Sequence, residues 1–233
     1  KQLLPRLYSH EHLFKRWYTV TLDEPADLAV GDIASSPDRT GSGFIIRHNI
    51  LRDNRARGIL IKASDGIIDN NLIDGSSIAG VVLCPEPDTW MEADFSRHVR
   101  ITNNTIRNIA YSHPNPNSIL TGGIAIVARD RDLNFGHSDI LVAGNILENI
   151  TGINILINAA RHITVRDNVL RQPRPEPVTT GGGSASNLGV DPSFLIWIDH
   201  VRDVQLDHNQ IPAGHQRVIG IGNDVRDLQI DNR

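Results

Sequence analysis

Residues 54–83 read NRARGILIKASDGIIDNNLIDGSSIAGVVL, and this stretch contains the repeat that decides the fold. Its centre, IDNNLI at 68–73, follows a simple phrase: an aliphatic residue, two variable residues, Asn, one variable residue and a second aliphatic residue. The phrase recurs along the chain, with its asparagine at Asn49, Asn71, Asn104, Asn145, Asn168 and Asn209. Because self-similarity of this kind is typical of repeat architectures, each phrase should mark one coil of a solenoid.

The spacing of the asparagines indicates the size of a coil. Successive steps are 22, 33, 41, 23 and 41 residues. A coil of about 22 residues holds three short strands and three turns, and the longer steps fit the same coil with an inserted loop. We therefore predict an all-β fold, a right-handed single-stranded parallel β-helix of about six to seven coils.

A second apolar run follows each phrase, usually opened by Gly, at 58–61, 80–83, 123–126, 152–157, 194–198 and 218–221. Short runs rich in β-branched residues and bounded by Gly, Asn, Asp and Ser predict strands that are buried by stacking. We assign the repeated asparagine a structural role. Its side chain tolerates the left-handed backbone of a tight turn, and its amide can bond the coils above and below.

The repeat also divides the chain. Residues 1–43 lack the phrase, so we expect a cap or the remnant of a preceding region, with an edge strand at 18–22. Residues 44–233 form the predicted β-helix, with inserted loops near 84–97, 110–122 and 172–192. Because the sequence begins at Lys1 without an initiator Met, we expect a processed chain or one piece of a longer protein.

Composition excludes several partners. Hydrophobic residues make up 39% of the chain but aromatic residues only 5%, which favours stacked aliphatic strands. The net charge of -4, with both signs mixed along the chain, provides no basic stripe for nucleic acid. No apolar stretch is long enough to span a membrane. The single Cys84 rules out an internal disulfide and leaves the redox compartment open.

Function should lie on an outer face or on the loops, because the interior of a β-helix is packed. If the aliphatic residues of the second run point inward, alternation sends Lys62, Cys84, Trp197 and Asp199 outward. Just past the same strand ends come Glu86, Arg129, Asp130, Asn158, His200 and Asp224. These positions predict a polar band along one side of the solenoid.

The loop CPEPDTWMEAD at 84–94 joins four carboxylates, Glu86 and Glu92 among them, to Trp90. Sugar recognition uses this mixture, because an indole stacks on a pyranose while carboxylates bond hydroxyls and transfer protons. The alternative is an acidic solvated loop with Trp90 packed on the solenoid. Trp197 and Asp199 repeat the combination two coils further on, although Trp197 can equally be a partly buried strand residue.

The spacing of the coils does not decide which two carboxylates would act together as general acid and base. Neighbouring coils lie about 4.8 Å apart, so Asp130 and Asp199, two coils apart, would be separated by roughly 9 to 10 Å. That is close to the upper end of the range for an inverting glycosidase, about 6.5 to 9.5 Å. Glu86 and Asp130, one coil apart, also fit. Arg55 and Arg57 offer guanidiniums to a sugar, or pair with Asp53 or Asp74.

We expect no required metal. The histidines show no HExxH spacing, which argues against zinc. The alternative is calcium held by Asp88, Asp94 or the pair Asp130 and Asp132, although no EF-hand loop is present.

Four segments carry a family resemblance: NRARGILI at 54–61, IDNNLIDGSSIAGVVL at 68–83, the loop with Trp90 and Glu92, and VRITNNTI at 99–106. They resemble right-handed β-helix glycosidases, most closely the α-galactosidases of glycoside hydrolase family 110. The resemblance implies an inverting, exo-acting hydrolase that removes terminal α-linked galactose with two carboxylic acids and no metal. Enzymes of that family are longer than this chain, and their catalytic aspartates are not matched to positions here.

A second, shorter resemblance is to a different family of enzymes. WIDH at 197–200 is similar to a motif of pectate lyases, which share the predicted pectate-lyase-like solenoid. The chain order differs, because the nearest counterpart of their catalytic arginine setting, Arg171 to Pro173, lies upstream.

We therefore expect a carbohydrate-active glycoside hydrolase acting on an oligo- or polysaccharide. Its general acid and base come from Glu86, Glu92, Asp130 and Asp199, and its substrate-binding residues are Arg55, Arg57, Lys62, Trp90, Arg129, Trp197 and His200. One alternative is a polysaccharide lyase or uronate epimerase, in which Lys62, Arg129 or His200 removes a proton. Another is a non-catalytic glycan-binding or structural β-helix. We expect a secreted or periplasmic protein, and a homodimer or further domains, because open solenoid ends invite association.

Overall fold

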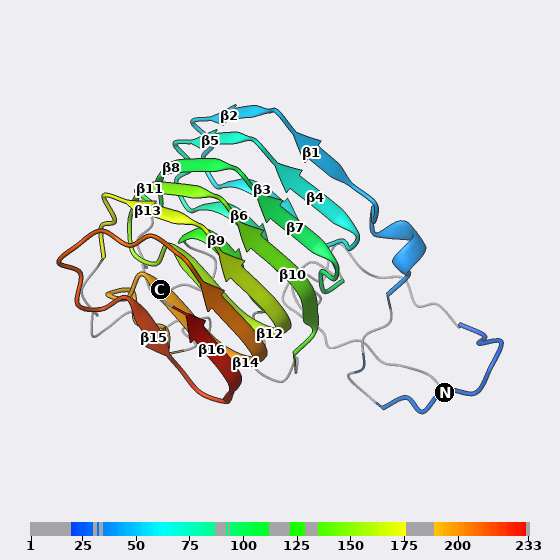
Figure 1. The fold of residues 1–233 in the computed structure, drawn as a ribbon. Coiled ribbons are helices and arrows are strands. Elements are labelled where there is room, and N and C mark those ends of the chain that lie inside the picture. The colour runs from blue at the N-terminus through cyan, green and yellow to red at the C-terminus, as the bar shows by residue number, and fades with distance from the viewer. Residues whose placement is uncertain are drawn as a thin grey trace.

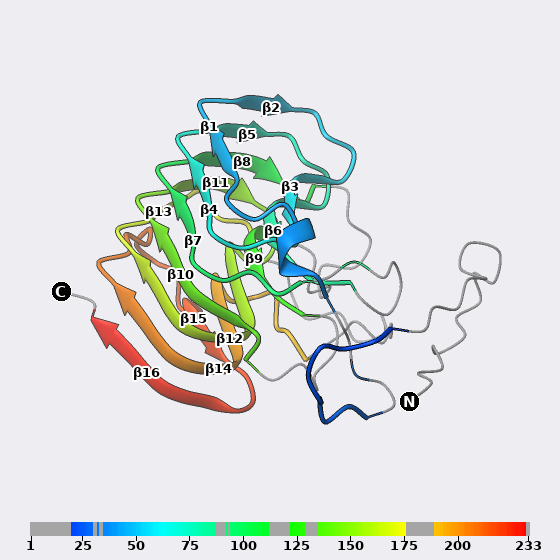
Figure 2. The same cartoon turned by 90° about the vertical axis from the view of Figure 1, so that its right-hand side faces the viewer.

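The chain winds into a stack of short parallel strands, a right-handed parallel β-helix (Figure 1). The computed structural model describes residues 20–29, 32, 35–86, 92, 94–111, 122–128, 135–175 and 189–231. Every strand pair in the described sheets is parallel, as the repeat predicts. Figure 2 shows these strands wrapped around a common interior.

Each coil contributes strands to three faces. The first face contains β1 (Ile45–Arg47), β4 (Gly66–Asp69), β7 (Val99–Thr102), β10 (His137–Ala143), residues 160–166 of β12 (Ile155–Arg166), residues 201–207 of β14 (Ile196–Asp207) and β16 (Val225–Asp231). The second contains β2 (Ile50–Arg52), β5 (Leu72–Asp74), β8 (Thr105–Ile109), β11 (Ile146–Ile150) and β13 (Val169–Arg171). The third contains β3 (Arg57–Ile61), β6 (Ala79–Leu83), β9 (Gly122–Ile126), residues 155–158 of β12, residues 196–199 of β14 and β15 (Ile219–Ile221). This stack agrees with the predicted coil number.

The register places equivalent aliphatic residues directly above one another. On the first face Ile68, Ile101, Val142, Val165 and Leu206 occupy one column, and all are buried. Side chains of all three faces meet in one hydrophobic core, which includes the inward residues of the second apolar run. Stacking of identical short segments therefore builds the core, as expected from the sequence.

The glycines that open the second apolar run have a packing function. Gly58, Gly80 and Gly123 lie above one another at the start of the third face. A Cβ atom on Gly80 would overlap the main-chain oxygen of Gly123 and the side chain of Ile106 on the second face. Absence of a side chain lets the second and third faces approach closely at this corner.

The repeated asparagines form a continuous ladder, which confirms their structural role. From Asn71 onward, the Oδ1 atom of each accepts hydrogen bonds from the backbone N and from Nδ2 of the asparagine one coil earlier, at 2.8 to 3.1 Å. Each Nδ2 also donates to a main-chain oxygen, as Asn104 does to Ile68 at 3.0 Å. Four of the six asparagines are buried: Asn71, Asn104, Asn145 and Asn168.

One part of the predicted reason is wrong. The ladder asparagines themselves do not adopt the left-handed conformation. The residue before each one does, with φ between 47° and 66°: His48, Asn70, Asn103, Gly144, Asp167 and His208. The residue that points outward therefore adopts the strained backbone conformation. The inward asparagine keeps an ordinary conformation and forms hydrogen bonds with the asparagines of neighbouring coils.

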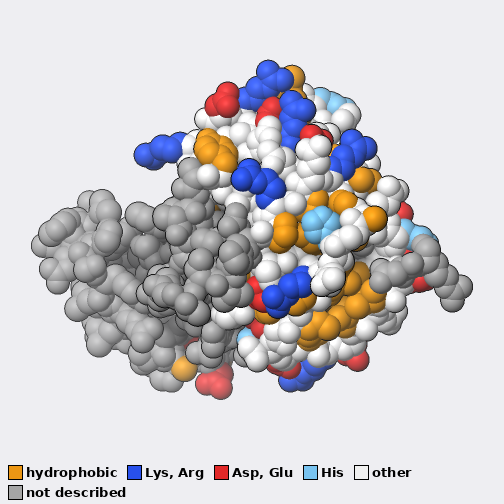
Figure 3. Space-filling view, turned by 90° about the vertical axis from the view of Figure 1, so that its left-hand side faces the viewer, with side chains coloured by type: hydrophobic (Ala, Val, Ile, Leu, Met, Phe, Trp, Pro, Cys, Tyr) orange, Lys and Arg blue, Asp and Glu red, His pale blue; other side chains and the backbone are white. Residues whose placement is uncertain are grey.

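The segment ahead of the first coil contains the short 3-10 helix η1 (Pro37–Arg39). Of the edge strand predicted at 18–22, residues 18 and 19 lie outside the described residues, and 20–22 form no strand. Within the described residues, no helix has the length and apolar character needed to cross a bilayer. On the side of the molecule drawn in Figure 3, Lys and Arg side chains lie scattered, with Asp and Glu side chains among them.

Candidate functional site

The candidate site lies at the corner where the third face turns into the first. The outward position at this corner is occupied, coil by coil, by Lys62, Cys84, Val127, Asn158, Asp199 and Gly222, each one residue beyond a paired core residue. Cys84 and Val127 in the middle of this row are fully buried. Two polar clusters therefore flank an apolar centre.

The first cluster joins Lys62 to two glutamates. The Lys62 Nζ atom donates to Glu86 Oε2 at 2.6 Å and also to Glu92 Oε2. Glu86 and Glu92 face each other across an antiparallel bridge, with Glu86 N donating to Glu92 O at 2.8 Å and Glu92 N donating to Glu86 O at 3.3 Å. The Glu86 side chain is 4% exposed and that of Glu92 is 54% exposed. Glu92 is thus the more accessible of the two carboxylates.

The second cluster is built around Asp199, which is 1% exposed. Its Oδ2 atom accepts from Asn158 Nδ2 at 3.0 Å and contacts His200 Nδ1 at 2.8 Å, while Oδ1 accepts from Asn223 N at 2.6 Å. A Cβ atom on Gly222 would overlap Asp199 Oδ1, so the next coil makes room for this carboxylate. Asp199 orients its neighbours and is shielded from direct contact with a substrate.

His200 is the accessible member of this cluster, with a side chain 25% exposed. Because Nδ1 faces Asp199, Nε2 is the ring nitrogen able to exchange a proton with another molecule. A histidine oriented by a buried carboxylate is a common arrangement for acid-base chemistry.

The two clusters are too far apart to share one reaction. The third-face register runs from Leu83 through Ile126 and Ile157 to Ile198, which is three strand spacings. Glu86 and Asp199 are therefore separated by about 14 Å along the axis, beyond the roughly 6.5 to 9.5 Å of an inverting pair. The predicted step of two coils between the Trp90 loop and Asp199 is wrong by one coil.

The predicted polar band is also wrong at Cys84 and Trp197. Trp197 points outward but is only 7% exposed, and its ring packs against Phe194 with centroids 5.6 Å apart. The outer side of the third face forms a second hydrophobic cluster, which includes Ala79, Val82, Cys84, Ala125, Val127, Leu156 and Trp197. The indole therefore contributes to packing and offers no face to a sugar.

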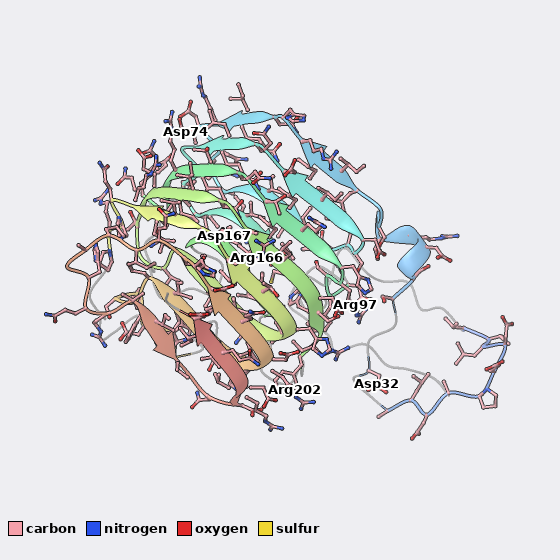
Figure 4. The ribbon with its side chains drawn as sticks, viewed as in Figure 1. Asp32, Asp74, Arg97, Arg166, Asp167 and Arg202 are labelled. Carbon is pink, nitrogen blue, oxygen red and sulfur yellow. The ribbon has the colours of Figure 1, made fainter. Side chains whose placement is uncertain are left out.

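Arg57 begins β3 and lies about 16 Å along the strand from Lys62, while Arg55 precedes β3 by two residues. Neither forms the expected pair with Asp74, which binds Arg107 instead, at 3.0 Å from Nε and 2.9 Å from Nη2. This contact lowers the pKa of Asp74. Figure 4 shows Asp74 at the far edge of the molecule from Arg97.

Several predicted residues are not placed by the structure. Trp90, Arg129 and Asp130 lie outside the described residues, as do Asp88 and Asp132 of the calcium alternative. Asp94 is described, and its Oδ2 atom accepts from Ser35 Oγ at 2.9 Å. Among the residues that are placed, no group of three or more His, Cys, Asp or Glu side chains is arranged to hold a metal ion.

Sequence reasoning missed His137, which is fully buried beside the corner. Its Nδ1 atom accepts from Ser96 N at 3.1 Å, and Nε2 bonds the main-chain oxygen of Val127 at 2.9 Å. Burial lowers the pKa of His137 to about 4, so the ring is neutral near pH 7. A single histidine within an apolar strand carries no distinguishing pattern, so no sequence signal could have identified it.

The chain belongs to the right-handed β-helix family, whose "Right handed beta helix region" matches residues 33–191. Its relatives include proteins named α-1,3-galactosidase B. The one from Akkermansia muciniphila is 29% identical over 133 residues, covering 55% of this chain and 17% of that protein. One from Phocaeicola vulgatus is 23% identical over 220 residues, covering 86% and 33%. One from Parabacteroides distasonis is 26% identical over 153 residues, covering 59% and 24%. The chain thus spans about a third or less of the length of these relatives.

Proposed function

We propose that this β-helix forms part of a glycoside hydrolase that cleaves terminal α-linked galactose from a glycan. The observation that carries the proposal is the similarity to an α-1,3-galactosidase B over 86% of the chain. The corner of the third and first faces carries carboxylates in both of its polar clusters. Carboxylates at such a corner supply the groups that glycoside hydrolysis requires.

Within this proposal, Glu92 and Glu86 act on the glycosidic bond and Lys62 orients both. Two oxygens bonded to one ammonium lie within about 5 to 6 Å of each other. This approaches the roughly 5 to 5.5 Å of a retaining pair and is shorter than the separation of an inverting pair. An inverting enzyme would instead combine Glu86 with another carboxylate, such as Asp130, which follows the apolar run 123–126 in the sequence.

The test is release of galactose by the full chain from α-1,3-linked galactosides, with β-galactosides as the comparison. Glu92→Gln should lower kcat at least 100-fold, because it removes proton transfer or nucleophilic attack. Glu148→Gln on β11, remote from the corner, is the matched control and should leave kcat unchanged. Absence of galactose release from every α-galactoside would refute the proposal. The anomer of galactose that is released first identifies the stereochemistry: α-galactose indicates a retaining enzyme and β-galactose an inverting one.

A second candidate is favoured by the Asp199 and His200 pair. In a polysaccharide lyase or uronate epimerase, His200 Nε2 would remove the proton next to a uronate carboxylate. A lyase forms an unsaturated product that absorbs in the ultraviolet. In that case His200→Gln abolishes activity while Glu92→Gln does not. Calcium dependence would accompany this second reaction only.

A further inference from the structure

A polar pocket lies at the start of the first face, next to the Lys62 cluster. Its volume is about 480 Å³, within the roughly 300 to 1,000 Å³ of small-ligand sites. Three chain segments line it: 38–42 ahead of β1, 64–65 ahead of β4, and 94–98 ahead of β7. Figure 4 shows Arg97, one of the lining residues, at the edge where the first-face strands begin.

Hydrogen bonds through Ser64 hold the three segments together. Ser64 N donates to Ser42 Oγ at 3.2 Å, and Gly43 N donates to the Ser64 main-chain oxygen at 3.0 Å. On the other side, Arg97 N donates to Ser64 Oγ at 3.0 Å, and Asp65 N donates to the Arg97 main-chain oxygen at 2.8 Å. The backbone of the three segments is therefore held together in advance of any ligand, which lowers the entropic cost of binding.

The side chains in the pocket combine hydroxyls with charges of both signs. Asp65 Oδ1 contacts His98 Nδ1 at 3.1 Å, and Asp94 Oδ2 lies 3.8 Å from Arg97 Nη1. Asp38 adds a third carboxylate. Three carboxylates against one guanidinium leave a net negative charge, whether or not His98 is protonated. Such a lining repels carboxylate and sulfate groups, and it accepts hydrogen bonds from neutral hydroxyls.

The pocket adjoins the proposed reaction centre along the chain. Asp94 N donates to the Lys62 main-chain oxygen at 3.0 Å, and Asp94 lies two residues beyond Glu92. A ligand held by Asp65, Asp94 and Arg97 would thus sit beside the Lys62, Glu86 and Glu92 cluster.

We propose that this pocket is a subsite for a neutral hexose unit of the glycan. As a subsite it rests on the proposed function, because the reaction centre beside it defines which bond is cleaved. The preference for an uncharged sugar distinguishes the two candidate functions. A galactoside fits the pocket, whereas the uronate required by a lyase or epimerase is repelled by its carboxylates.

The experiment is calorimetric titration of the full chain with methyl α-galactoside and, separately, with galacturonate. Asp65→Asn is the test variant and Asp203→Asn the matched control. Both aspartates occupy the same left-handed turn position in different coils, with φ of 56° and 54°, and Asn tolerates that conformation. Asp203 is not part of the pocket lining.

The wild-type chain should bind the galactoside and bind galacturonate at least tenfold more weakly. Asp65→Asn should weaken galactoside binding about tenfold, through loss of a charge-assisted hydrogen bond. Asp203→Asn should stay within about twofold of wild type. The inference is overturned if galacturonate binds as well as the galactoside, if the two variants weaken binding equally, or if neither sugar binds saturably.

Different experimental results would refute the subsite and the proposed hydrolase function. If Glu92→Gln abolishes hydrolysis while Asp65→Asn leaves KM and the dissociation constant unchanged, the subsite is wrong and the hydrolase stands. If Asp65-dependent galactoside binding is measured without turnover of any galactoside, the pocket binds a neutral hexose and the hydrolase is wrong.

Discussion

Replacing Asn104 by Ala should be among the most destabilising single changes in the solenoid. The Asn104 side chain is fully buried and makes four hydrogen bonds. Its Oδ1 atom accepts from the N and Nδ2 atoms of Asn71 at 3.0 and 2.9 Å, and its Nδ2 atom donates to Ile68 O and Asn145 Oδ1, each at 3.0 Å. Each buried polar group that loses its partner costs about 1 to 3 kcal/mol. Several are affected, so we expect a loss of about 3 to 5 kcal/mol in the free energy of unfolding.

Asn49→Ala at the outer end of the ladder provides the control. Asn49 is exposed, and its side chain donates only to Arg47 O and Asn71 Oδ1. Water can replace these bonds, so the expected loss is about 1 kcal/mol. Urea unfolding followed by circular dichroism measures both values from the shift in midpoint. Equal losses for the two variants would refute the view that the buried ladder stabilises the stack.

Three further predictions concern the buried histidine, the close-packed glycines and an ion pair. Burial holds the pKa of His137 at about 4 against an unfolded value near 6.5, so its neutral form contributes stability above pH 6.5. This contribution, about 3 kcal/mol, should be lost as the pH falls from 6.5 to 4, and urea titrations of wild type and His137→Gln should converge there. Gly80→Ala should lower the thermal midpoint more than Gly41→Ala, since an added Cβ meets main chain at the first, whereas at the second it meets nothing within 4 Å and adds only the strain of a φ of 77°. Asp74→Asn should remove a small stabilisation that the wild type shows above about pH 4, because Arg107 lowers the pKa of this carboxyl; equal acid unfolding of both proteins would contradict it.

The fold was predictable because the repeat appears directly in the residues. Asn71, Asn104 and Asn145 recur at one position, and stacking identical amides is the arrangement that satisfies all of them when buried. The left-handed residue could not be placed, because the residues before the asparagines differ in type. His48 and Asp167 adopt the same conformation as Gly144, so the turn, rather than a glycine preference, sets the backbone.

The sequence predicted which side chains of the candidate site point outward, but not how exposed each of them is. Alternation correctly sends Lys62 and Asp199 outward. The contacts of Lys62 with Glu86 and Glu92 come from the structure alone. It does not reveal that the outer side of the third face is itself packed, which buries Trp197. The apolar run at 152–157, followed by Asn158, already marks the additional coil before Asp199 in the sequence, so the step from the Trp90 loop could have been counted as three coils.

The asparagine ladder has a direction. In every rung the accepting oxygen belongs to the later coil and the donating groups to the earlier one, as between Asn104 and Asn145. The two ends of the solenoid are therefore unlike. Two copies meeting by a two-fold axis at one end would oppose acceptor to acceptor or donor to donor, whereas a translated copy would continue the rungs. A coil added after Asn209 would have to supply the accepting oxygen, and a coil added before Asn49 would have to supply the donating groups.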